Sequence, residues 1–78
     1  MKYAIYITTR ILASDSKWYY RHGAFCLHEH KVSKEFEPKY FDTIESASSK
    51  IAELKSIGEP REIKIAEFIN SKHVSDIK

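Results

Sequence analysis

The chain carries one clearly amphipathic segment, Ile44-Glu45-Ser46-Ala47-Ser48-Ser49-Lys50-Ile51-Ala52-Glu53-Leu54. Its apolar residues recur at spacings of three and four positions, as they do along one side of an α-helix. The residues on this apolar side are Ile44, Ala47, Ile51 and Leu54. The opposite side is polar and holds Glu45, Ser48, Ser49, Glu53 and Lys55. The pattern predicts a helix over about residues 43–57 that lays its apolar side on a sheet.

Two residues are expected to bound this helix. Asp42 is the expected N-cap, because its carboxylate can accept hydrogen bonds from the amides of the first turn. Glu45, three positions later, completes a pattern similar to a capping box. Gly58 is expected to end the helix, since glycine adopts the left-handed conformation at low cost.

An N-terminal strand is predicted over residues 2–9, where β-branched and aromatic residues predominate. Because side chains alternate across a strand, both faces of this strand are largely apolar. One face holds Tyr3, Ile5 and Ile7, and the other holds Ala4, Tyr6 and Thr8. We therefore expect both faces of the strand to be partly covered.

The next segment is predicted to form a hairpin with this strand. Ser14-Asp15-Ser16-Lys17 carries short polar side chains that favour a turn, and Trp18-Tyr19-Tyr20 begins a second aromatic strand. Gly23 marks a bulge or a separate turn. Residues 24–32 are expected to be extended again, and Pro38 ends that stretch because proline donates no ladder hydrogen bond.

The segment over residues 61–69 fits two patterns. Ile63 and Ile65 alternate as in a strand, whereas Ile65, Phe68 and Ile69 also fit a helical stripe. The strand is favoured, because it can return the chain to pair with residues 2–9. Residues 70–78 are polar, and we expect a frayed tail or one more turn of helix there.

These elements predict a single α+β domain over residues 1–69. The expected fold is an antiparallel sheet of three to four strands with one amphipathic helix packed on one face, in the order β-β-(β)-α-β. The 78 residues fit one core. A content of 42% hydrophobic and 31% charged residues is typical of a folded protein.

Cysteine content and net charge indicate which cellular location and which partners to expect. The single cysteine, Cys26, excludes an intramolecular disulfide and favours a reducing, cytoplasmic location. The apolar run over residues 1–7 is too short for a signal sequence or a membrane span, so no membrane association is expected. The formal net charge of +2 comes from residues spread along the chain, so nucleic acid is neither implied nor excluded.

Cys26, His28 and His30 form a pattern with metal-ligand chemistry. In an extended strand they point to one side, with His22 at the same parity, and thiolate and imidazole groups are zinc ligands. Structural zinc needs four ligands, usually with turn-forming spacers, and Gly23 interrupts the parity. A solvated strand face with one buried thiol is therefore favoured, and no metal or other cofactor is expected.

Lys17-Trp18-Tyr19-Tyr20-Arg21 is the expected binding segment. Aromatic rings flanked by cations are typical of platforms on which single-stranded bases stack. In a strand, Trp18 and Tyr20 share a face while Tyr19 lies opposite, so some of these rings must fill the core. A ring that stays exposed would equally anchor a protein interface, where Trp, Tyr and Arg are enriched.

No catalytic residues are expected. Glu35 and Glu37 share a strand parity, but acids beside Lys34 and Lys39 are typical of a solvated edge. No Ser-His-Asp order or nucleotide fingerprint occurs, and two glycines cannot form a Gly-rich loop. So short a chain also has little room for a large ligand pocket. We therefore expect the protein not to be an enzyme.

The junction Phe41-Asp42-Thr43-Ile44-Glu45-Ser46-Ala47, followed by Ile51, Leu54 and Glu62-Ile63-Lys64-Ile65, resembles small uncharacterised single-domain proteins of tailed bacteriophages and mobile elements. Those proteins start with a strand like residues 1–9, carry a Trp or Tyr hairpin, and begin a helix through a similar Phe-x-Thr-x-x-x-Ala junction. The resemblance covers most of the chain, although residues 24–32 depart from it. It implies a compact protein that binds a host macromolecule and alters it.

The leading expectation is a non-enzymatic protein-binding module, for example a phage-encoded inhibitor or modulator of a host defence system, polymerase or nuclease. The alternative is a single-stranded nucleic-acid-binding domain that uses Trp18 and Tyr20 with Lys17 and Arg21. A homodimer through edge-strand pairing is a further alternative.

Overall fold

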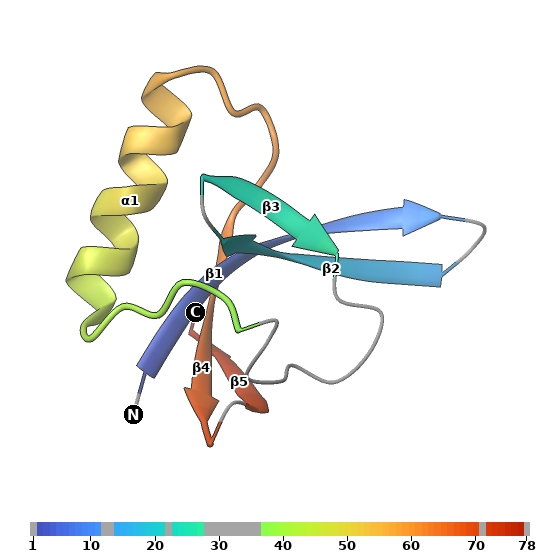
Figure 1. The fold of residues 1–78 in the computed structure, drawn as a ribbon. Coiled ribbons are helices and arrows are strands. Elements are labelled where there is room, and N and C mark those ends of the chain that lie inside the picture. Colours follow the sequence, from blue (N-terminus) through green and yellow to red (C-terminus); the bar gives the residue numbers. More distant parts are fainter. Residues whose placement is uncertain (1, 12–13, 22, 28–36, 71, 78) are drawn as a thin grey trace.

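The computed structural model describes residues 2–11, 14–21, 23–27, 37–70 and 72–77. These residues form a five-stranded antiparallel sheet with one helix packed against it (Figure 1). The elements are β1 (Lys2–Ile11), β2 (Ser14–Arg21), β3 (Ala24–Leu27), α1 (Ile44–Ser56), β4 (Lys64–Ile69) and β5 (Lys72–Ile77). The strand order is β3-β2-β1-β4-β5. The predicted α+β fold is confirmed, with five strands where three to four were expected.

The amphipathic segment forms α1, within the predicted range of 43–57. Its N-cap is Thr43, which corrects the expectation that Asp42 fills this position. Thr43 has an extended backbone, and its Oγ1 accepts a hydrogen bond of 3.1 Å from the Ser46 amide. The helical conformation starts at Ile44, so the side chain that can reach the first-turn amides belongs to the residue just before it.

The C-terminal end of α1 is closed by a Schellman motif. Gly58 has φ +104°, the left-handed conformation expected for it. Its amide donates to the Lys55 carbonyl over 3.2 Å, and the Glu59 amide donates to the Leu54 carbonyl over 3.1 Å. These two bonds satisfy carbonyls that have no partner inside the helix. The stop predicted at Gly58 is confirmed.

The predicted β1–β2 hairpin is present, but Ser14–Lys17 is part of β2 and not the turn. This segment pairs with β1, from Lys17 opposite Thr8 to Ser14 opposite Ile11. Pairing with β1 satisfies the backbone hydrogen-bonding groups of this polar segment, which explains why it is a strand. Gly23 has φ +87° and forms a separate turn between β2 and β3. The predicted extended stretch over residues 24–32 is confirmed over β3, and its remainder lies outside the described residues.

The C-terminal half of the sheet differs from the expectation in one element. β4 confirms the strand predicted within residues 61–69 and pairs with β1 as expected. The frayed tail expected over residues 70–78 is corrected, because Lys72–Ile77 forms β5 beside β4. Hydrogen bonding to β4 stabilises this segment although its own sequence is polar.

The core has one cluster on each face of the sheet. On the face covered by α1, the buried residues are Ile5, Ile7, Tyr20, Phe41, Ala47, Leu54 and Ile63. On the opposite face, they are Ala4, Tyr6, Tyr19, Ala66 and Phe68. The alternation predicted for the first strand is therefore confirmed, with both faces of β1 buried. Among the described residues, no helix is long and apolar enough to cross a membrane.

The segment before α1 is fixed to the backbone of β1 and β2. Tyr3 and Phe41 exchange two backbone hydrogen bonds, of 2.9 and 2.7 Å, and the Lys39 amide donates to the Tyr20 carbonyl over 2.9 Å. Figure 1 shows α1 on one side of the sheet, with the far end of the β1–β2 hairpin reaching beyond it. The C-terminal end of α1 also lies close to Gly23 and Ala24, so the two segments border the same region of the surface.

Candidate binding site

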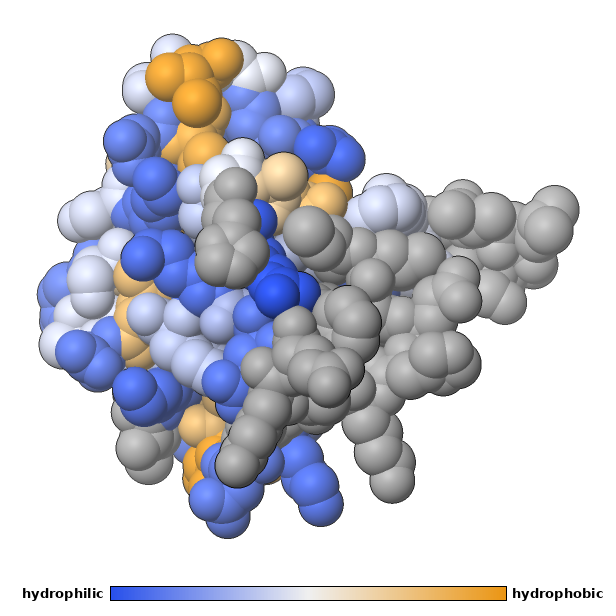
Figure 2. Space-filling model, viewed as in Figure 1, coloured by the Kyte–Doolittle hydropathy of each residue, from blue (hydrophilic) through white to orange (hydrophobic). Residues whose placement is uncertain are grey.

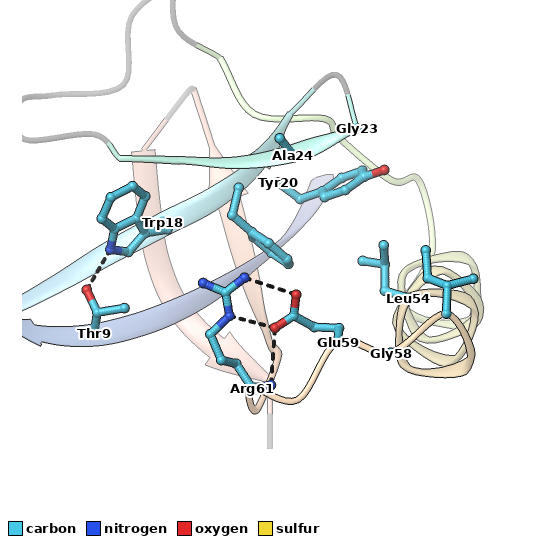
Figure 3. A pocket seen from close by; sticks show the side chains of 11 residues that line it. Thr9, Trp18, Tyr20, Gly23, Ala24, Leu54, Gly58, Glu59 and Arg61 are labelled. Carbon is cyan, nitrogen blue, oxygen red and sulfur yellow. Dashed lines mark hydrogen bonds and ion pairs between the residues drawn. The ribbon is translucent and has the colours of Figure 1, made fainter.

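A pocket of about 500 Å³ opens between the C-terminal end of α1 and the hairpin of β2 and β3 (Figure 3). We call it the apolar pocket. Its lining residues are Thr9, Trp18, Tyr20, Gly23, Ala24, Phe25, Leu54, Ile57, Gly58, Glu59 and Arg61. The pocket is open to solvent, so it does not contradict the expectation that so short a chain can hardly enclose a large one.

The sheet wall of the apolar pocket is aromatic. Trp18 and Tyr20 alternate along β2, so both side chains face the helix side of the sheet. Phe25 is opposite Tyr20 in the β2–β3 register, and the two rings meet edge to face with centroids 5.5 Å apart. The Trp18 Nε1 donates to Thr9 Oγ1 over 2.6 Å, which holds the indole ring in place.

The helix wall is formed by Leu54 and Ile57. Leu54 ends the apolar stripe of α1 and is buried, whereas Ile57 follows the helix and is 76% exposed. Figure 2 shows hydrophobic atoms at the surface over this end of α1. Ile57 is the most exposed of the large hydrophobic residues in the described part of the chain, so an uncovered apolar side chain borders the pocket.

An ion pair from the loop after α1 lies between these two walls (Figure 3). Arg61 donates to Glu59 through Nε (2.6 Å), Nη2 (3.0 Å) and its backbone amide (3.1 Å). Hydrogen bonding from Arg61 is the main cause that lowers the pKa of Glu59. The Arg61 guanidinium also lies 5.7 Å from the centre of the Phe25 ring. The pair thus presents a fixed carboxylate and a cation against an aromatic wall.

A second pocket, of about 380 Å³, shares Tyr20 and Gly23 with the first. Its other lining residues are Arg21, Glu37, Pro38, Lys39 and Lys50. Three side chains among these carry positive charge and one carries negative charge, so we call it the basic pocket. The two together are the paired pockets.

Lys50 is held at the basic pocket by α1. Its Nζ donates to Glu53 over 2.8 Å and lies 5.4 Å from the centre of the Tyr20 ring. The hydrogen bond to Glu53 is the main cause that raises the pKa of Lys50. The ammonium group is therefore charged across the physiological range and sits beside a buried aromatic ring.

The structure divides the predicted binding segment Lys17–Arg21 between the two faces of the sheet. Trp18 and Tyr20 line the apolar pocket and Arg21 lines the basic pocket. Tyr19 belongs to the core on the opposite face, where Lys17 lies over the Tyr6 ring. The alternation expected of Trp18, Tyr19 and Tyr20 is thus confirmed, and a single surface does not hold all five side chains.

Sequence reasoning missed several residues of the paired pockets. Ile57 stands beside Gly58 at the helix end, and Glu59 and Arg61 flank Pro60. The only sequence signal is an apolar residue at a position where the helix has already stopped. Lys39 and Lys50 are ordinary surface lysines in the sequence, and they meet at one pocket only because the Lys39 amide bonds to β2 and α1 packs on the sheet.

The richest cluster of titratable groups lies on the opposite face of the sheet. Tyr6 donates to Asp76 Oδ1 over 2.8 Å, and His73 Nε2 lies 2.7 Å from the same oxygen. The Tyr19 hydroxyl lies 2.7 Å from His73 Nδ1. The His73 ring also stacks on Phe68, with centroids 5.6 Å apart. We call Tyr6, Tyr19, His73 and Asp76 the tyrosine network.

A β-bulge makes this network possible. His73 and Asp76 are three positions apart, and in a regular strand such residues face opposite sides. In β5, however, His73 pairs with Phe68 and Ser75 with Glu67, so Val74 is an extra residue. This extra residue turns His73 and Asp76 to the same face, which is a recognised effect of bulges.

The pKa values indicate a structural role for the network. Burial, reinforced by the charge of Asp76, raises the pKa of Tyr19 to about 12, and burial and the bond to Asp76 raise that of Tyr6 further. Burial alone would raise the pKa of Asp76, but hydrogen bonds from Tyr6 and His73 lower it overall. At neutral pH both phenols keep their protons, so neither is a ready nucleophile or base.

The predicted metal candidates cannot be placed. His22, His28 and His30 lie outside the described residues, and so does the side chain of Cys26. The part of the chain that the structure describes contains no group of three or more metal-ligating side chains.

Comparisons with protein-family models, with curated proteins and with solved structures gave no match to this chain.

Proposed function

We propose that this domain is a non-enzymatic protein-binding module that recognises its partner through the paired pockets. The exposed Ile57 beside an aromatic wall carries this proposal. Trp, Tyr and Arg side chains around a partly desolvated pocket are the composition of interface hot spots. The resemblance to phage proteins suggests a host protein as the partner, such as a component of a defence system, a polymerase or a nuclease.

The site supports a protein partner better than single-stranded nucleic acid. Stacking needs accessible ring faces, whereas Tyr20 is only 6% exposed and Tyr19 lies on the other face of the sheet. Glu59, which lines the apolar pocket together with Tyr20, would also repel phosphates. Capture of nucleic acid in place of a protein is the competing outcome of the experiment described below.

The tyrosine network supports a role without catalysis. Its two phenols and its imidazole bond to one another and to Asp76, so their hydrogen-bonding capacity is largely used within the protein. The raised phenol pKa values also leave little phenolate at neutral pH. Such a closed network is better suited to holding β5 on the sheet.

Affinity capture from a bacterial lysate, compared between wild type and Ile57→Glu, tests the proposal. A charge on this exposed side chain should leave the fold intact and remove the specific partner. Val74→Glu is the matched control, because Val74 is also an exposed apolar residue (50%) but lies on β5. Capture of the same proteins by wild type and Ile57→Glu would overturn the proposal, as would capture of nucleic acid alone.

A further inference from the structure

We infer, resting on the proposed function, that the paired pockets bind a short peptide segment of the partner that carries a large apolar side chain next to an acidic one. The apolar side chain would enter the apolar pocket, and the acidic side chain would lie in the basic pocket. The partner is therefore a protein with a linear motif in which a large aromatic or aliphatic residue lies next to an acidic residue.

The apolar pocket matches one large side chain. Its volume of about 500 Å³ lies within the range of ligand pockets. Trp18, Tyr20 and Phe25 form one wall and Leu54 and Ile57 the other, so a ring or branched chain between them would lose contact with water on the two sides that meet these walls. Ile57 would lose its exposure on binding, which adds to the gain from burying apolar surface.

The basic pocket matches a carboxylate. Arg21, Lys39 and Lys50 line it together with Glu37, and Glu53 pairs with Lys50, which leaves one more positive than negative charge. The Lys50 ammonium group has three donors, and its hydrogen bonds to Glu53 and Tyr20 use two of them. A carboxylate placed here would be attracted by several cations at once, whereas a lysine side chain would be repelled.

The two pockets meet at Tyr20 and Gly23, which places both parts of the motif close together. Gly23 has φ +87°, and a Cβ added there would meet no atom within 4 Å. Gly23 therefore places no side chain between the two pockets, and the space above it is open. A peptide backbone can pass over this point while two of its side chains enter the pockets on either side.

Selection from a random linear peptide library displayed on phage, with the full-length chain as bait, tests the inference. We expect the enriched peptides to combine tryptophan, phenylalanine or leucine with a nearby glutamate or aspartate. The selected peptide is then synthesised with a fluorophore, together with one version that has lysine for the acid and one that has alanine for the apolar residue. Fluorescence polarisation at low and high salt gives the affinities.

Variants of the protein assign the contacts. Lys39→Glu and Lys50→Glu should each weaken binding of the selected peptide by about fivefold or more, in line with a lost and reversed ion pair. Lys72→Glu is the control, because Lys72 is exposed on β5 and lines neither pocket. Circular dichroism of each variant confirms that the fold persists.

The outcomes separate this inference from the proposed function. One outcome is that peptide affinity falls with Ile57→Glu but does not change when the acidic residue of the peptide, Lys39 or Lys50 is replaced. This outcome would overturn the acidic motif and would still support the protein-binding module. Enriched basic peptides, or no enriched peptides, would also overturn the acidic motif. A labelled single-stranded oligonucleotide that binds in a Lys39-dependent manner would overturn both proposals.

Discussion

Asp76 joins parts of the chain that are far apart in the sequence. Its Oδ1 accepts a hydrogen bond from Tyr6, 70 positions away, and also bonds to the nearby His73. Without the carboxylate, the Tyr6 hydroxyl would lose this hydrogen-bond partner although Tyr6 is only 1% exposed. The single carboxylate thus couples the last strand to the first.

The charge of Asp76 should make stability depend on pH. Because the folded-state pKa lies below the ordinary value of 3.8, its contribution is fully present above that value and is lost as the pH falls through the folded-state pKa. Asp76→Asn keeps an oxygen acceptor but removes the charge. We expect this variant to lose about 1 kcal/mol at neutral pH and to show a weaker acid dependence of unfolding.

Urea unfolding followed by tryptophan fluorescence, at neutral pH and on both sides of pH 3.8, measures this effect. The other carboxylates are common to wild type and variant, so their acid dependence cancels in the difference. Parallel stability curves for the two proteins would contradict the role given to the Asp76 charge.

The ends of α1 are set by local hydrogen bonds. Thr43 caps the first turn and Gly58 closes the last. The Thr43 Oγ1 also lies 2.7 Å from the Ser46 hydroxyl, so the cap involves both the amide and the side chain of Ser46. These bonds fix the helix ends, and with them the place where Ile57 leaves the helix beside the apolar pocket.

Replacing the N-cap should cost more than replacing the residue before it. We expect Thr43→Ala to lower the free energy of unfolding by about 1 kcal/mol, the usual cost of a lost cap. Asp42→Ala is the matched control and should cost clearly less, because Asp42 precedes the capping position. Chemical denaturation of both variants decides between them, and equal losses would return the capping role to Asp42.

The whole molecule is organised as a sheet with a core on each face. Ile5 and Ile7 of β1 pack on the helix side, and Ala4 and Tyr6 pack on the other. Residues 4–7 of the central strand are therefore buried on both faces and inaccessible to a partner. Recognition is left to the rim of the helix layer, where the paired pockets lie, and to the outer strands.

The bulge in β5 also bears on self-association. An extra residue in an outer strand disrupts the regular row of backbone groups that a second strand would pair with. Val74 is that residue, and it lies in the middle of β5. Pairing of two copies through β5 is therefore disfavoured, although β3 forms the other edge of the sheet.

Removal of residues 72–78 should destabilise the whole domain. The truncation deletes His73 and Asp76 and leaves the hydroxyls of Tyr6 and Tyr19 without these partners, at a cost of about 2 kcal/mol or more. Thermal unfolding by circular dichroism measures the loss. Hydrogen exchange on the intact chain is the second measurement, and slow exchange of β5 amides is expected. An unchanged melting temperature would mean that the tail is dispensable.

Local patterns in the sequence determined a large part of this fold. The spacing of Ile44, Ala47, Ile51 and Leu54 predicted α1, the alternation in residues 2–9 predicted a strand with both faces partly covered, and Gly58 predicted the helix end. These features depend on residues close together in the chain, where periodicity and backbone preference act directly. The sequence also identified Trp18 and Tyr20 as residues of the candidate site.

Tertiary structure alone decided β5, its bulge and the paired pockets. The polar segment Lys72–Ile77 is a strand because β4 supplies its hydrogen bonds, and Val74 is a bulge only relative to the register of that neighbour. Lys50 and Arg61 reach the pockets because α1 packs across the sheet, and Lys39 does so because its amide bonds to the Tyr20 carbonyl of β2. Each of these features depends on partners distant in the sequence, and a local sequence pattern carries no information on which distant groups come into contact.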